Sequence, residues 1–232
     1  MVSSRKSMIC IAGFGDNASM FDNLLTTNLS EEYDLRPLDL PGFGAQSELK
    51  QTTLRALADF VLEEAVRSNS HYIMAHSVAS IIATLAAEAS NDFIEEIISL
   101  EGNITAADAY FSGTAANFEN ALDFRRSFLV RLSEMSMDND PILTRYSAMF
   151  EACDPLAAWQ LGSDACAFSK ANVPGERLIA AARVHYLFNP DNCPPETIDW
   201  LAKSEMKQTV LTGASHWPTI DQPHELVAAL LG

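Results

Sequence analysis

The amino-acid sequence predicts an α/β fold, in which a mostly parallel six-stranded sheet carries helices on both faces and a helical lid insertion. Short apolar runs of strand length alternate with helix-like segments along most of the chain. This alternation is typical of a parallel sheet that is covered on both faces. It breaks between residues 104 and 180, where only helical periods occur. We therefore expect residues 1–103 and 181–232 to form an α/β core and residues 104–180 to form the lid.

The predicted strands are short apolar runs at residues 8–11, 34–38, 71–74, 94–100, 184–188 and 206–211. The predicted helices of the core lie between and after these strands, at residues 19–29, 54–68, 78–89, 194–204 and 224–231. A helix between two strands allows both strands to run in the same direction.

Two helices of the insertion are expected to begin at Asp140-Pro141 and Asp154-Pro155. Asp can cap the free N–H groups of a helix, and Pro suits the first helical position. The insertion is also rich in aromatic and Met residues, namely Tyr110, Phe111, Phe118, Phe124, Phe128, Met135, Met137, Tyr146, Met149, Phe150, Trp159 and Phe168. We expect most of them to pack the insertion onto the sheet and a few to line an apolar pocket.

Composition excludes several classes of partner. The formal net charge of −16 argues against nucleic acid, because contacts to phosphates need clustered Lys and Arg. No apolar run reaches the length of about 20 residues that a membrane helix needs, and no signal-peptide core is present, so we expect a cytoplasmic protein without a membrane partner. The four cysteines show no C-x-x-C spacing, which favours free thiols and argues against a zinc site; they are Cys10, Cys153, Cys166 and Cys193.

One segment combines a strand, a serine between small residues, and a helix. Ser77 follows the predicted strand 71–74, and Ala75 and Ala79 lie two residues to either side of it. A nucleophilic serine on a strained strand-to-helix turn needs small residues at these positions, because the strand and helix backbones approach closely. The usual pattern G-x-S-x-G has glycine at both positions. The alternative is an ordinary serine that caps the helix N-terminus.

Two further segments support the nucleophile. His216 lies on a loop after the last predicted strand, where a base can reach a serine at the carboxyl edge of the sheet. Gly13 and Gly15 follow the first strand, and glycines there let backbone amides approach a reacting oxygen. Each feature alone also fits a packed histidine or a plain glycine turn. Their order along the chain favours a serine–histidine pair.

These motifs resemble those of the α/β-hydrolase superfamily. The segment 39–44 with Ser47 is similar to the family's D-x-x-G-x-G-x-S loop, and the resemblance covers most of the chain outside the insertion. It implies that the usual N-terminal hairpin is absent and that the backbone amides of Phe14 and Val78 form the oxyanion hole. We expect no cofactor and no metal. The sequence departs from the family at Ala12, where a histidine is usual.

The family places the acid of its catalytic triad after either of two strands. After the strand 94–100, Glu101 follows directly, and some members, the haloalkane dehalogenases among them, carry a Glu acid there. After the strand 184–188, the usual in-register position is occupied by Asn192, and Asp191 lies one residue early. We prefer Glu101 and keep Asp191 as the alternative acid.

The resemblance implies a serine hydrolase that is esterase-like and acts through an acyl-enzyme on a small, uncharged, apolar ester, lactone or amide. Epoxide hydrolysis and dehalogenation are disfavoured, because those relatives carry Asp at the position of Ser77. The alternative is a small-ligand receptor or signalling protein on the same fold with a slow triad. A small apolar molecule is the expected partner in either case.

Overall fold

A single parallel sheet forms the centre of the computed structural model, which describes residues 5–45, 50–136 and 140–232. The sheet has the order β2-β1-β5-β6-β7-β8, and every neighbouring pair is parallel. Its strands are β1 (Lys6–Ile11), β2 (Tyr33–Leu38), β5 (Tyr72–His76), β6 (Glu96–Leu100), β7 (Arg183–Phe188) and β8 (Lys207–Val210). The predicted six-stranded parallel sheet is confirmed. Ser47 and Met137 lie outside the described residues.

The strand order has a switch point between β1 and β5, at the carboxyl ends of these strands. From β1 the chain first adds β2 on one side and later adds β5 on the other side. The connections after β1 and β5 therefore diverge from neighbouring strand ends. In open α/β sheets, ligands bind at such a switch point, outside the carboxyl ends of the strands. Two very short strands, β3 (Leu40–Pro41) and β4 (Gly44–Ala45), pair in the loop after β2.

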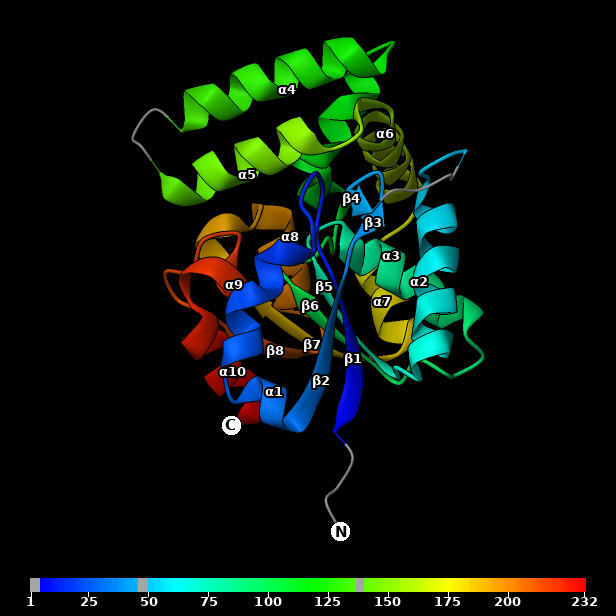
Figure 1. Ribbon diagram of the computed structural model, residues 1–232, viewed down its shortest axis with the longest axis vertical. Helices are drawn as coiled ribbons and strands as arrows, with labels where there is room; N and C mark the ends of the chain where they lie inside the picture. The colour runs from blue at the N-terminus through cyan, green and yellow to red at the C-terminus, as the bar shows by residue number, and fades with distance from the viewer. Residues whose placement is uncertain (1–4, 46–49, 137–139) are drawn as a thin grey trace.

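Helices cover both faces of the sheet (Figure 1). On one face α3 packs between two other helices; these three are α2 (Leu54–Ser68), α3 (Ala79–Ala89) and α7 (Pro174–Ala181). The other face carries the 3-10 helix η1 (Ala18–Thr26) with α1 (Leu29–Glu32), α8 (Pro195–Leu201), α9 (Pro218–Asp221) and α10 (Pro223–Leu231). The predicted single helix at 19–29 is thus two short helices, because Thr27 adopts an extended backbone between them.

Every described element between β6 and β7 is helical. The elements are η2 (Ala106–Tyr110), η3 (Ser112–Asn117), α4 (Ala121–Met135), α5 (Pro141–Ala152), α6 (Pro155–Ala171) and α7. α5 and α6 begin at the Asp-Pro pairs, where the Asp140 and Asp154 carboxylates accept hydrogen bonds from the first free N–H groups. α4, α5 and α6 lie above one end of the sheet (Figure 1), whereas α7 packs on α3. The division into core and lid remains a prediction. Because α7 packs on α3, it belongs with the helices that cover the face of the sheet.

The core is one continuous apolar cluster. Nearly every residue of α3 is buried, and its small side chains let it lie close to β5 and β6. The four cysteines are unpaired thiols. Among the described residues, none of the helices has the length and hydropathy of a membrane span.

A buried histidine joins β7 to the edge strand β8. His185 is 3% exposed, and its Nε2 lies 2.8 Å from the hydroxyl of Thr209. Burial, and then the charge of Lys207, lower the pKa of His185 to about 4. The folded protein therefore resists protonation at a pH where the unfolded chain binds a proton.

We expect the free energy of unfolding to fall as the pH drops from about 6.5 towards 4, by up to about 3 kcal/mol from this residue. His185→Gln keeps a nitrogen donor near Thr209 but cannot titrate. Urea unfolding of both proteins between pH 7.5 and 4 should show a smaller acid loss for the variant. Parallel stability curves for the two proteins would contradict this assignment.

Candidate active site

Ser77 lies on a strained turn between β5 and α3. Its φ of +54° is in the left-handed region, which non-glycine residues rarely adopt. Its N–H donates to the carbonyl of Leu100 (2.9 Å), and its carbonyl accepts from the N–H of Ser80 (3.0 Å). The first bond extends the β5–β6 ladder by one residue, and the second begins the helix. The side chain is consequently presented at the carboxyl edge of the sheet.

Small neighbours make this turn sterically feasible. Ala75 on β5 and Ala79 on α3 are completely buried, where the strand and the helix converge. A methyl group at each position is accommodated in place of the family's glycines. Alanine in place of glycine at these two positions of the G-x-S-x-G pattern is therefore compatible with the turn.

The loop after β1 lies directly against Ser77. A Cβ atom added to Gly13 would lie 2.9 Å from the Cβ of Ser77 and 2.7 Å from Nδ1 of His76. The next residue, Phe14, is fixed from the inserted helices, because the hydroxyl of Tyr146 donates to its carbonyl (2.7 Å). Among the described residues, no hydrogen bond occupies the N–H of Phe14 or Val78. Both amides therefore remain available to an oxyanion.

His216 and Glu101 face each other from different loops. Nδ1 of His216 lies 3.5 Å from Oε2 of Glu101, an ion pair when the ring is protonated and slightly long for a hydrogen bond. Contacts of this kind commonly shorten when a substrate binds. Since Nδ1 faces the acid, Nε2 is the nitrogen that remains for Ser77. Ser77 and His216 line the same cavity.

Glu101 is rigidly held at the end of β6. Its side chain is 2% exposed, and its φ of +50° is also left-handed. Its N–H donates to the carbonyl of Leu187 (2.9 Å). Its Oε1 accepts from the N–H of Asn189 (2.6 Å) and from Nδ2 of Asn192 (3.2 Å). The carboxylate is therefore buried with donors, as a buried charge requires.

The two candidate acids occupy different environments. Asp191 is exposed, and within the described residues its carboxylate makes no hydrogen bond or ion pair. The structure thus brings Glu101, but not Asp191, to His216. Asn192, at the family's usual acid position, instead supports Glu101 and also donates to the carbonyl of Ala214 (3.1 Å). In the sequence, Asn192 marks only the absence of an acid at this position; its register with the end of β7 is the signal that places it near Glu101.

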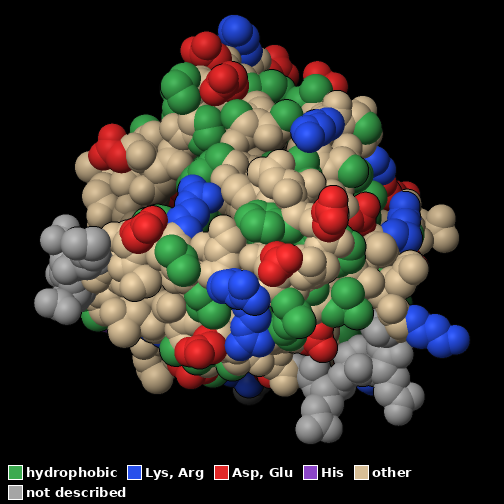
Figure 2. All heavy atoms as spheres, turned by 90° about the horizontal axis from the view of Figure 1, so that it is seen from above, with side chains coloured by type: hydrophobic (Ala, Val, Ile, Leu, Met, Phe, Trp, Pro, Cys, Tyr) green, Lys and Arg blue, Asp and Glu red, His purple; other side chains and the backbone are tan. Residues whose placement is uncertain are grey.

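The cavity at Ser77 is small and mostly apolar. Its volume is about 110 Å³. Three of the aromatic and Met residues expected from the insertion line it; the apolar and aromatic lining is Phe14, Tyr110, Phe111, Met135 and Trp217, and the polar lining is Ser77, Asp108, Ser112 and His216. Buried residues such as Phe124, Phe128 and Phe150 pack the inserted helices instead. Acidic and basic side chains are interspersed over the face above these helices, with no single-sign patch in that view (Figure 2).

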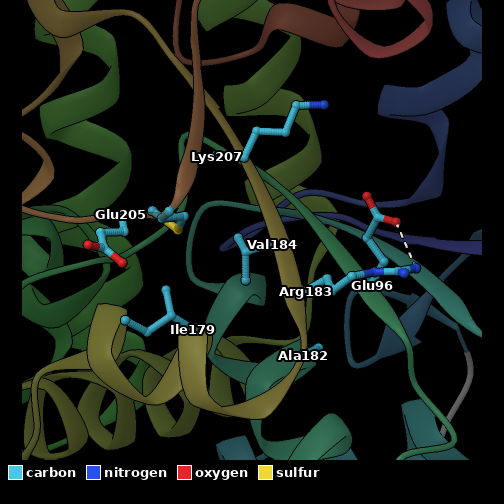
Figure 3. Close-up of a pocket in the computed structure, with 8 residues that line it drawn as sticks. Glu96, Ile179, Ala182, Arg183, Val184, Glu205 and Lys207 are labelled. Atoms are coloured by element: carbon cyan, nitrogen blue, oxygen red, sulfur yellow. Dashed lines mark hydrogen bonds and ion pairs between the residues drawn. The ribbon is translucent and has the colours of Figure 1, made fainter.

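A larger hollow of about 590 Å³ lies at the opposite end of the sheet (Figure 3). It is formed where β6, β7 and β8 begin, and it includes the ion pair between Arg183 and Glu96. Its lining has no serine, cysteine or histidine. The chemistry of the molecule is therefore expected at the carboxyl edge.

The buried hydrogen bond between Asn192 and the Glu101 carboxylate can be tested by changing its charge. Asn192→Asp would place two carboxylates within about 3 Å of each other and raise the pKa of one of them. The folded state would then bind an extra proton, so the variant should lose stability as the pH rises. We expect a loss of roughly 3 kcal/mol at pH 8, a typical magnitude for an uncompensated buried charge, and less at pH 5.

The matched control is the exchange Glu101→Gln with Asn192→Asp, which restores one carboxylate and one amide. Urea unfolding should show that this double variant recovers most of the stability. Equal stability of the single and double variants at pH 8 would argue against the buried contact.

Comparisons with known proteins agree with this architecture. No match is found among curated proteins. Solved structures with similar folds include an esterase from Thermogutta terrifontis (18% identity, TM-score 0.73, 97% of this chain and 88% of that chain covered). They also include an esterase from Exiguobacterium antarcticum (14%, 0.76, 98% and 91%) and an enol-lactonase from Burkholderia xenovorans LB400 (15%, 0.73, 98% and 90%). The profile of the Alpha/beta hydrolase family matches residues 8–230, and the chain belongs to that family.

Proposed function

We propose that this hydrolase is a serine esterase in which Ser77 is the nucleophile, His216 the general base and Glu101 the acid that supports it. One observation carries the proposal. Ser77, on its left-handed turn, shares a cavity with His216, whose other side faces the buried Glu101 carboxylate. A nucleophile, a base and a group that orients the base are the minimum set for acyl transfer.

The reaction proceeds in two halves. His216 Nε2 takes the proton of Ser77 as Oγ attacks the substrate carbonyl, and the carbonyl oxygen becomes an oxyanion bound by the amides of Phe14 and Val78. The imidazolium then protonates the leaving alcohol, and the acyl-enzyme remains. His216 next removes a proton from water, which attacks the acyl carbon. Collapse of the second tetrahedral intermediate releases the acid and returns the proton to Ser77.

The cavity favours a small, uncharged acyl group. Its lining is mainly aromatic, and its volume of about 110 Å³ accommodates few atoms beyond the reacting carbonyl. The Asp108 carboxylate in the lining is already occupied, because it accepts from the N–H groups of Ile104 and Thr105 and from the hydroxyl of Thr197. Burial raises the pKa of Asp108, and the hydrogen bonds from Thr105, Ile104 and Thr197 oppose this rise. Esters and lactones fit this site best, and the proteins of similar fold include esterases and an enol-lactonase.

The separation of His216 from Glu101 and the small cavity also support a second candidate, a receptor that binds a small apolar ligand and turns it over slowly. Both candidates require a reactive Ser77. They differ in whether the acyl-enzyme is hydrolysed, so labelling and turnover must be measured together.

A serine-directed phosphonate should label the protein with one equivalent on Ser77 and stop the hydrolysis of a short-chain 4-nitrophenyl ester. Ser77→Ala should abolish both while retaining the wild-type circular dichroism. Ser112→Ala, which changes another serine of the same cavity, is the matched control and should keep labelling and turnover. Stoichiometric labelling with negligible turnover would favour the receptor, and labelling that survives in Ser77→Ala would refute the nucleophile.

Glu101→Gln should lower ester turnover by about four orders of magnitude, because the imidazole then loses its correct tautomer and its charged form loses support. Asp191→Asn removes an exposed carboxylate and should change turnover less than about threefold, as surface changes have small effects. Steady-state kinetics of the two variants decide the assignment. The reverse ranking would make Asp191 the acid.

A further inference from the structure

The residue before the nucleophile is a buried histidine with a specific partner. His76 ends β5, is 2% exposed, and places Nε2 at 2.6 Å from the backbone carbonyl of His216. A carbonyl oxygen only accepts hydrogen bonds, so Nε2 must carry the proton. Nδ1 then has no hydrogen, and among the described residues it has no hydrogen-bond partner.

The environment of His76 keeps its ring neutral. Burial, and then the positive charge that His216 can carry, hold the pKa of His76 well below its ordinary value. A neutral ring bonded at Nε2 has a fixed tautomer. His76 is therefore suited to hold a position and unsuited to exchange protons with the substrate.

The ring of His76 lies between two parts of the site. On one side it meets Gly13 of the oxyanion loop, where an added Cβ would lie 2.7 Å from Nδ1. On the other side its centroid lies 4.8 Å from that of the His216 ring, at an interplanar angle of 57°. One rigid side chain, anchored on a central strand, thus touches both loops that flank Ser77.

Hydrogen bonds hold the loop that carries His216 on both sides of the base. After it, the carbonyl of Trp217 accepts from the N–H groups of Ile220 (2.9 Å) and Asp221 (3.3 Å). Asn189 and Asn192 donate to the carbonyl of Ala214, and Asp221 accepts from the N–H of Ser215. These bonds fix the loop before the base. The bond to His76 is the one that holds the backbone of His216 itself, within the part of the chain that the structure describes.

We propose that His76 is a positioning residue, whose Nε2–H holds the carbonyl of His216 and so sets the distance and orientation of the base relative to Ser77. This role rests on the proposed serine-hydrolase function. Because proton transfer needs a well-aligned donor and acceptor, a displacement of about 1 Å can lower a rate by about 100-fold. His76 acts on the chemical step through His216 and makes no contact with the reacting atoms.

Two variants of similar size separate the hydrogen bond from packing. Gln places an amide N–H close to the position of Nε2, whereas Met has a similar length and no donor. We expect His76→Met to lower kcat for a short-chain 4-nitrophenyl ester by about 10- to 100-fold with KM changed less than about twofold. His76→Gln should stay within about threefold of the wild type. Equal losses in the two variants, or a loss that falls on KM, would overturn the proposal.

Two measurements keep the test decisive. His185→Gln alters another buried histidine, at β7–β8, and should leave kcat unchanged. Nitrogen-15 NMR of the five histidine side chains should show, besides the neutral ring of His185, a second ring that stays neutral below the pH at which a free histidine titrates, with its proton on Nε2. The signals of this second ring should be absent in His76→Gln. A proton on Nδ1, or a charged ring at pH 7, would refute the contact even if the His76→Met variant does not fold. If the wild type hydrolyses no ester, the proposed function fails, while the NMR result still reports on the contact.

Discussion

The hydrogen-bond ladder of the parallel sheet extends one residue beyond each of its two central strands, β5 and β6, and so fixes the backbone of that residue. The N–H of Ser77 continues the ladder to Leu100, and the N–H of Glu101 continues it to Leu187. Both residues have positive φ angles, which cost about 1–3 kcal/mol each and persist only where the surroundings over-determine them. Ser77, the proposed nucleophile, and Glu101, its proposed supporting acid, are consequently held by the hydrogen bonds of the sheet, and the remaining groups of the proposed site are arranged around them.

The base is positioned differently, because its loop follows the edge strand β8. Backbone carbonyls on this loop are bound by side chains that come from the centre of the sheet, namely the two Asn residues after β7 and His76 on β5. The same Asn residues also bind the Glu101 carboxylate. The same amides therefore bind Glu101 and the loop of His216, which links the positions of the two residues and gives the buried carboxylate hydrogen-bond donors.

The inserted helices line the cavity and also fix the position of Phe14. Phe14 packs against the aromatic rings of Phe124, Phe128 and Phe150, and its carbonyl accepts from Tyr146. The loop that carries the proposed oxyanion amide is thus in contact with the insertion on one side and, through Gly13, with Ser77 on the other. The packing of α4 and α5 therefore determines the position of Phe14.

Local patterns in the sequence suffice to predict the parallel sheet, the helical insertion and the serine turn, because strand and helix periodicities, Asp-Pro helix starts and small residues around Ser77 are properties of short segments. The resemblance to the α/β-hydrolase family narrows the acid to Glu101 or Asp191. Which carboxylate meets His216 depends on the tertiary structure, because a loop after β7 must be placed in space before its exposed Asp and its inward Asn can be distinguished. The same holds for His76, since its partner lies 140 residues away in the sequence. Long-range contacts of this kind leave no periodicity along the chain.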